Sequence, residues 1–119
     1  MWIFLNNSFI SIVEYQPPEA EITDHLLVRA RAEDDIERFL LGASSKQALS
    51  WVKNCSVFTD ETADYHHRLV APKWLVSECL AAHAENIDYP NFKSSVSNSH
   101  RHDAYMEVWT AMYKAYGGH

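Results

Sequence analysis

Glycine is scarce in this chain, with three residues in 119, at Gly42, Gly117 and Gly118. Loops that cradle phosphate groups need closely spaced glycines, and so does the strained turn that presents a nucleophilic serine. Neither spacing occurs in the sequence. The pattern therefore argues against phosphate-binding enzymology and against a hydrolase built on a nucleophile elbow.

Cysteine is scarcer still. Cys55 and Cys79 are too few for a disulfide framework, and they lack the CxxC spacing of metal and redox sites. We expect both to act as small hydrophobic residues, with Cys79 on the apolar face of a helix and Cys55 partly exposed near a strand. A catalytic thiol is the alternative for Cys55.

Long apolar runs are also missing, since no stretch approaches the roughly 20 residues that span a bilayer. The apolar start, Trp2 to Leu5, has no basic segment before it and ends at Asn6. This pattern is unlike a secretory signal. We therefore expect a cytoplasmic protein with no membrane partner.

Negative charge is concentrated in one part of the chain, whose net charge is −6. The stretch from Glu14 to Glu37 holds eight acids against Arg29 and Arg31, a surplus that equals the whole net charge. An acidic surface repels phosphate, so we expect no direct nucleic-acid binding and instead a protein partner with a basic surface. The alternative is a solvated face that aids solubility.

Alternating apolar residues predict an antiparallel sheet. The first two strands flank Asn6-Asn7-Ser8, which predicts a hairpin, and a third completes a meander. Two later strands flank an acidic turn. The expected strands cover residues 2–5, 9–15, 25–32, 57–58 and 65–71.

Helical periodicity predicts three helices. A short one follows Glu33-Asp34-Asp35 and stops at Gly42, and a second begins at Pro72 with an inner stripe to Ile87. The third covers residues 103–116, where the apolar side chains that recur at helical spacing are Tyr105, Val108, Trp109, Met112, Tyr113 and Tyr116.

The remaining segments are less regular. Residues 44–54 fit a further helix or a loop, and residues 92–98 read as a polar crossing. The expected architecture is a single α+β domain over residues 1–119, an antiparallel sheet with helices packed on one face and a C-terminal amphipathic helix. We expect Tyr105, Trp109 and Tyr113 to pack in the core, and Trp51 and Trp74 to be exposed anchors for a partner.

Two segments near the C-terminus carry a resemblance: IDYPNFKSSV from Ile87, and His102-Asp103-Ala104-Tyr105 followed by VWTAMY from Val108. They resemble a family of short uncharacterised bacterial and phage proteins with an IDYxNFKxSV plus HDAYxxVWxxMY pattern. Residues 2–13 and the stretch LLVRARAEDDIERFL from Leu26 are also similar to that family, whereas 44–54 looks like an insertion. The resemblance implies a phage or mobile-element protein and, by context, a host-directed role such as inhibiting bacterial immunity.

Seven histidines invite a metal hypothesis. The tightest set is His100, His102 and Asp103, with His66 and His67 elsewhere, and this set would serve a metal-dependent hydrolase. On a helix, however, positions two apart diverge by about 200°, and adjacent strand residues face opposite sides. We therefore expect no metal and no cofactor, with Asp103 either capping the start of the terminal helix or placing a negative charge there instead.

The leading hypothesis is a non-enzymatic, acidic protein-binding domain of a phage or mobile element. It would inhibit a host nucleic-acid-binding or defence complex, as an anti-CRISPR protein does, in the bacterial cytoplasm. The predicted partner-binding residues are Glu33, Asp34, Asp35, Glu37, Asp60, Glu61 and Asp64. Arg29 and Arg31 would neutralise neighbouring acids or bind an anion. The other alternative is a scaffold that self-associates through a sheet edge or a helix.

Overall fold

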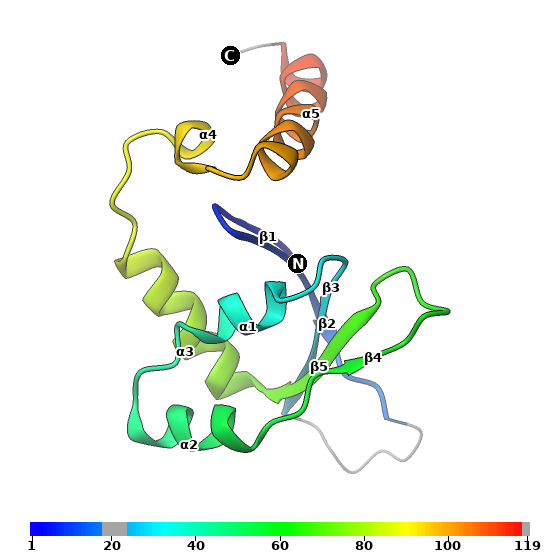
Figure 1. Cartoon of the computed structure of the whole chain (residues 1–119), viewed down its shortest axis with the longest axis vertical. Coiled ribbons are helices and arrows are strands. Elements are labelled where there is room, and N and C mark those ends of the chain that lie inside the picture. Colours follow the sequence, from blue (N-terminus) through cyan, green and yellow to red (C-terminus); the bar gives the residue numbers. More distant parts are fainter. Residues whose placement is uncertain (18–23, 118–119) are drawn as a thin grey trace. The chain divides into compact units, whose positions relative to one another are not determined.

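Two groups of elements make up the structure, a computed structural model that describes residues 1–17 and 24–117 (Figure 1). The contacts divide the chain into one unit at Met1–Ile87 and a second at Asp88–His119. The expectation of a single domain stays a prediction. Glu19 and Glu21, part of the predicted acidic stretch, lie outside the described residues.

The first unit contains the predicted antiparallel sheet, with five strands in the order β1-β2-β3-β5-β4. The hairpin and the meander are confirmed, because β1 pairs with β2 and β2 with β3. Two later strands, which pair with each other, flank an acidic turn as expected. The strands are β1 Trp2–Leu5, β2 Ser8–Glu14, β3 His25–Ala30, β4 Phe58–Thr59 and β5 His67–Pro72.

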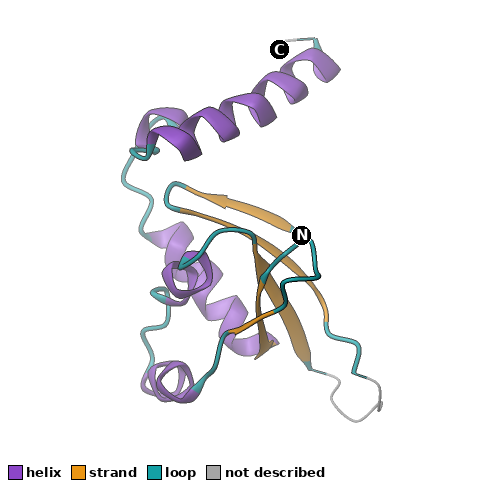
Figure 2. Ribbon diagram, turned by 45° about the vertical axis from the view of Figure 1, so that its right-hand side comes forward, coloured by secondary structure: helices purple, strands orange, loops and turns teal. Residues whose placement is uncertain are grey.

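The core lies on one face of this sheet. Ile12 pairs with Val28, which pairs with Leu69, and all three are buried. Two helices, α1 (Asp35–Leu40) and α3 (Lys73–Glu85), cover that face (Figure 2). The α+β class with helices on one sheet face is therefore confirmed.

The helix α1 ends where two backbones come close together. A Cβ placed on Gly42 would lie 2.7 Å from the carbonyl oxygen of Cys79 and 2.9 Å from its Cα. Since both atoms belong to the backbone of α3, a side chain at this position has no room unless the helix moves. The glycine that ends α1 thus also sets how closely the chain after α1 approaches α3.

Residues 44–54, for which the sequence fits either a helix or a loop, contain the helix α2 (Lys46–Asn54). The hydroxyl of Ser45 accepts a hydrogen bond from the Ala48 N–H and caps its start. The Glu78 carboxylate of α3 accepts from the N–H groups of Ser44 (3.0 Å) and Ser45 (3.2 Å). These bonds tie the start of α2 to α3.

The second unit contains two helices, α4 (Phe92–Ser95) and α5 (Ser99–Tyr116). The expected polar crossing therefore holds a helical turn, because the Asn91 side chain caps it at Ser94. The terminal helix begins four residues earlier than predicted, because Asn98, and not Asp103, accepts the Arg101 N–H as its cap. No helix in the described residues has the length and apolarity needed to cross a bilayer.

Candidate protein-binding surface

One end of the sheet is held together by two arginines and a tyrosine. The guanidinium carbons of Arg29 and Arg31 lie 4.6 and 4.4 Å from the centre of the Tyr65 ring, which is buried. The ring attracts both positive groups through cation–π contacts, which strengthen the packing of the two arginines against Tyr65. Arg31 also donates a 3.1 Å hydrogen bond to the Asp64 carbonyl oxygen. We call this group the Tyr65 clamp.

The clamp joins two segments that are more than thirty residues apart in the sequence. Ala30, the last residue of β3, pairs with His67, the first residue of β5. The segment after β3 and the segment before β5 therefore leave the sheet at the same end. Five predicted site residues lie on these two segments; we call them the acidic rim, and they are Glu33, Asp34, Asp60, Glu61 and Asp64.

Most of the acidic rim faces solvent. Glu33, Asp34, Glu61 and Asp64 are exposed, and Asp60 is half-buried. The hydroxyl and the N–H of Thr62 donate to the Asp60 carboxylate, and with Arg68 nearby they lower its pKa. This carboxylate is therefore ionised at neutral pH, as a charged contact surface requires.

Asp35 is one of two predicted site residues that the structure places elsewhere. It is 1% exposed, and its carboxylate accepts the Phe9 N–H at 3.0 Å and an Arg38 N–H at 3.1 Å. A buried charge needs such partners. Asp35 thus links α1 to β2, and this role removes it from the surface that a partner can contact.

Glu37 is exposed but belongs to a different neighbourhood. It lies close enough to Cys55 to help raise the pKa of that thiol, an effect caused first by burial. Cys55 follows the last residue of α2, so Glu37 faces that end of the helix. We therefore leave Glu37 out of the acidic rim.

Arg29 and Arg31 contact neutral groups in the part of the chain that the structure describes, and the expectation that they neutralise nearby acids stays a prediction. No ion pair joins either guanidinium to a described carboxylate; Arg29 donates to the Ser11 hydroxyl at 2.7 Å, and Arg31 to a backbone carbonyl. The two cations hold Tyr65 instead. Their role is structural, because the clamp fixes the loop that carries Asp60, Glu61 and Asp64.

The thiols are poorly suited to catalysis. Burial raises the pKa of Cys79 to about 11, and Glu78 adds to the shift. The pKa of Cys55 is raised as well. A nucleophilic cysteine needs the opposite shift, because the thiolate is the reactive form.

The histidines do not gather. Across residues 1–17 and 24–117, no three histidine, cysteine or acidic side chains are placed to hold one metal ion. His100 and His102 lie on α5, two positions apart, and the His102 Nδ1 lies 3.7 Å from a carboxylate oxygen of Asp103. His66 is exposed beside the half-buried His67. The metal-dependent hydrolase stays an alternative prediction.

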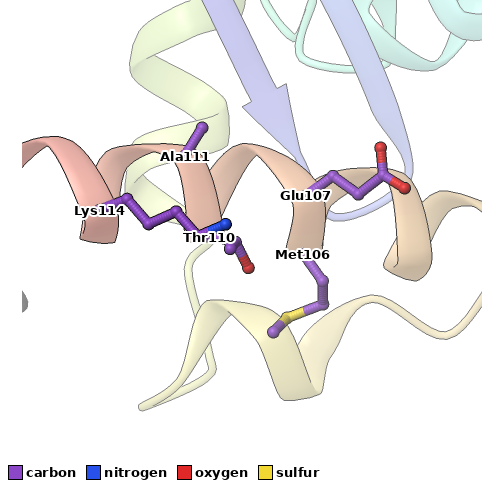
Figure 3. Close-up of a pocket in the computed structure, with 5 residues that line it drawn as sticks. All are labelled: Met106, Glu107, Thr110, Ala111 and Lys114. Atoms are coloured by element: carbon purple, nitrogen blue, oxygen red, sulfur yellow. The ribbon is translucent and has the colours of Figure 1, made fainter.

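Two hollows on the surface are shallow. One, of about 390 Å³, follows α5 and is lined by Met106, Glu107, Thr110, Ala111 and Lys114. All five come from one helix, and Met106 points toward α4, away from Glu107 and Ala111 (Figure 3). These side chains do not converge on one point. The hollow is the open flank of a helix and lacks the enclosing walls of a ligand site.

The second hollow, of about 420 Å³, lies where α2 meets the start of α3. Trp51 and Trp74 line it together with Gln47, Ser50, Asn54 and Cys55. Of the two expected anchors, Trp74 is exposed, whereas Trp51 is half-buried and packs against the core.

The apolar face of α5 is the surface feature that the sequence interpretation missed. Trp109 and Tyr113, expected in the core, are exposed in the structure, and so are Val108, Met112 and Tyr116. The sequence signal for this face is the aromatic stripe, whose spacing predicts a covered surface without saying what covers it. Trp, Tyr and Met are also the residues enriched at protein interfaces.

Comparison with models of protein families, with curated proteins and with solved structures found no match for the chain. The resemblance to short bacterial and phage proteins therefore stays a prediction. The functional argument depends on the geometry described above.

Proposed function

We propose that this protein is a non-enzymatic protein-binding domain whose acidic rim contacts a basic surface on its partner. The observation that carries the proposal is the Tyr65 clamp, which holds two acidic loops from distant parts of the sequence at one end of the sheet. Ordered carboxylates attract a basic partner more effectively than the same charges on loose loops, because fewer conformations are lost on binding.

The chemistry of the rim indicates the kind of partner. A surface rich in exposed carboxylates resembles, in charge, the phosphate backbone of a nucleic acid. A protein that displays such a surface competes with nucleic acid for arginine- and lysine-lined sites. We therefore propose a host nucleic-acid-binding or defence complex as the target, a phage or mobile element as the source, and the bacterial cytoplasm as the place of action.

The test compares two double variants with the same change in net charge. Glu33→Lys with Glu61→Lys reverses two exposed rim acids, and Glu85→Lys with Glu107→Lys reverses two exposed acids outside the rim. The immobilised full-length chain is incubated with a bacterial lysate at 0.15 M NaCl. We expect the wild type and the control to capture the same nucleic-acid-binding protein, and the rim variant to capture at least about tenfold less.

Competition provides the second readout. Short duplex DNA, which the proposal predicts not to bind this protein, should release the captured partner, and so should 1 M NaCl. The proposal fails if the complex survives high salt and DNA, if the rim variant binds as well as the wild type, or if both double variants lose binding equally.

A further inference from the structure

The exposed apolar face of α5 is the largest feature that the proposed function leaves unused. Five large apolar side chains on this 18-residue helix are 42–72% exposed. At 100° per residue they cover an arc of about 140° together with Tyr105. We call this arc the α5 face; its residues are Tyr105, Val108, Trp109, Met112, Tyr113 and Tyr116.

The short helix α4 covers only the beginning of the α5 face. The Phe92 ring stacks on Tyr105 with centroids 5.8 Å apart, and the Lys93 ammonium lies 4.4 Å from the centre of the Trp109 ring. The rest of the face stays open, and Trp109 and Tyr113 stack on each other at 5.1 Å. An exposed, rigid aromatic pair is typical of an interface anchor.

The α5 face has a property that points to a second copy of the chain. Its residues are arranged symmetrically about the midpoint between Thr110 and Ala111. If a second α5 is placed antiparallel about a twofold axis at that midpoint, each member of the face meets another member. The resulting pairs are Tyr105 with Tyr116, Val108 with Tyr113 and Trp109 with Met112.

Self-complementarity of this kind is what a twofold interface requires, because the same patch must cover itself. The spacing of Tyr105, Trp109, Met112 and Tyr116 at intervals of four, three and four residues is also the seam of an antiparallel helix pair. An unrelated partner would need only the apolar area and would not require this symmetry.

The distribution of charge fits the same occupant. Residues 88–119 contain three acids and three lysines or arginines, so the second unit is neutral and the whole net charge of −6 belongs to Met1–Ile87. No member of the α5 face is charged. When two copies meet through α5, the members of the two faces therefore bring no like charges together, and the Lys93 ammonium of each copy lies over its own Trp109 ring.

The available area suffices for a weak but specific dimer. Large apolar side chains present roughly 150–250 Å² each, so the exposed fractions leave about 500 Å² on each α5 face. Two copies would bury about 1,000 Å² in total, which is the lower limit for a specific interface. We propose that the chain forms a homodimer through antiparallel pairing of its α5 faces, independently of any partner at the acidic rim.

The first test measures the mass of the full-length chain by sedimentation equilibrium between 1 and 500 µM. We expect a reversible shift from 13.7 kDa to twice that mass. Trp109→Lys and Met112→Glu should each weaken dimerisation more than tenfold. The matched control is Ala111→Lys, which adds a charge to the opposite side of the same helix and should leave the dimer intact.

The second test uses the predicted register. Since Trp109 of one copy faces Met112 of the other, an equimolar mixture of the Trp109→Lys and Met112→Glu variants should dimerise although neither does so alone. This recovery also shows that the variants are folded. The proposal is overturned if the wild type remains monomeric at 500 µM, if the mixture remains monomeric, or if Ala111→Lys disrupts the dimer as strongly as Trp109→Lys does. It is also overturned if a monomeric wild type co-sediments with anionic lipid vesicles instead.

Discussion

Replacement of Asp35 should destabilise the protein far more than replacement of any acid on the rim. Asp35 belongs to a run of acids in the sequence, yet its carboxylate is buried and accepts hydrogen bonds from the Phe9 N–H and from Arg38. Asp35→Ala removes a charged acceptor and leaves a backbone donor of β2 without its partner. Both effects reduce the stability of the contact between α1 and the sheet.

The magnitude follows from these contacts. A hydrogen bond to a charged group contributes about 1.5–3 kcal/mol, and a buried donor left without a partner costs about 1–3 kcal/mol. The Arg38 side chain is 40% exposed, so this ion pair adds less than about 1 kcal/mol. We expect Asp35→Ala to lower the free energy of unfolding by about 3 kcal/mol, and the melting temperature by roughly 12–24 °C.

Urea unfolding followed by far-UV circular dichroism measures this change, with the slope compared between variants to confirm that the same surface is exposed. Asp35→Asn, which keeps an acceptor oxygen, should recover part of the loss. The control is Glu37→Ala on the same helix, where the side chain is exposed and the change should stay within about 0.5 kcal/mol. If Asp35→Ala unfolds at the same urea concentration as Glu37→Ala, then Asp35 does not link α1 to β2 as described.

Three further predictions concern the packing, the pH dependence and the thiols. Gly42→Ala should destabilise the protein by about 2 kcal/mol or more, because the added methyl group meets the backbone of α3. Adding Cys79→Ala should not rescue this variant, since the clash is with backbone atoms. Equal urea midpoints for Gly42→Ala and the wild type would contradict this prediction. Hydrogen bonds from Ser45, and then from Ser44, lower the pKa of the Glu78 carboxyl in the folded protein. The stability that this carboxylate contributes is therefore fully present above its ordinary pKa of 4.5, and it is lost as the pH falls through the lower pKa of the folded state. Glu78→Gln should abolish that part of the acid dependence in urea titrations from pH 3 to 7, and an unchanged pH profile would refute it. Both thiols should react slowly with a disulfide reagent at pH 7.5, because their raised pKa values leave little thiolate. Cys79 should react roughly a hundredfold more slowly than an unperturbed thiol. Rapid reaction of Cys55 would restore the hypothesis that this thiol is catalytic.

Most elements of the fold could be predicted because their signals are local. The meander of β1, β2 and β3 follows from period-two alternation and from the Asn6-Asn7 turn, and α1 follows from the apolar spacing that ends at Gly42. The start of α5 was predicted at Asp103, and the cap is instead Asn98, five residues earlier, which only hydrogen-bond geometry identifies.

The candidate site was less predictable because it depends on contacts between distant segments. Nothing local in the sequence separates buried Asp35 from exposed Asp34, since the difference is the Phe9 N–H on another strand. The Tyr65 clamp likewise requires the β3–β5 register that brings Arg29 and Arg31 to the tyrosine. An apolar stripe also predicts that a surface needs covering, but it does not say whether the same chain or another molecule covers it.

The acidic rim and the α5 face lie in different units, so their contributions to function are separable. A dimer formed through α5 carries two rims, and a target with two basic sites within reach would bind it more tightly than one rim alone, by roughly 100-fold or more, through effective concentration. The Trp109→Lys variant should therefore keep the affinity of a single rim while losing that gain. If this variant binds the captured partner as tightly as the wild type does, each rim acts alone and the dimer serves another purpose. Complete loss of binding would instead place part of the partner contact on the α5 face itself.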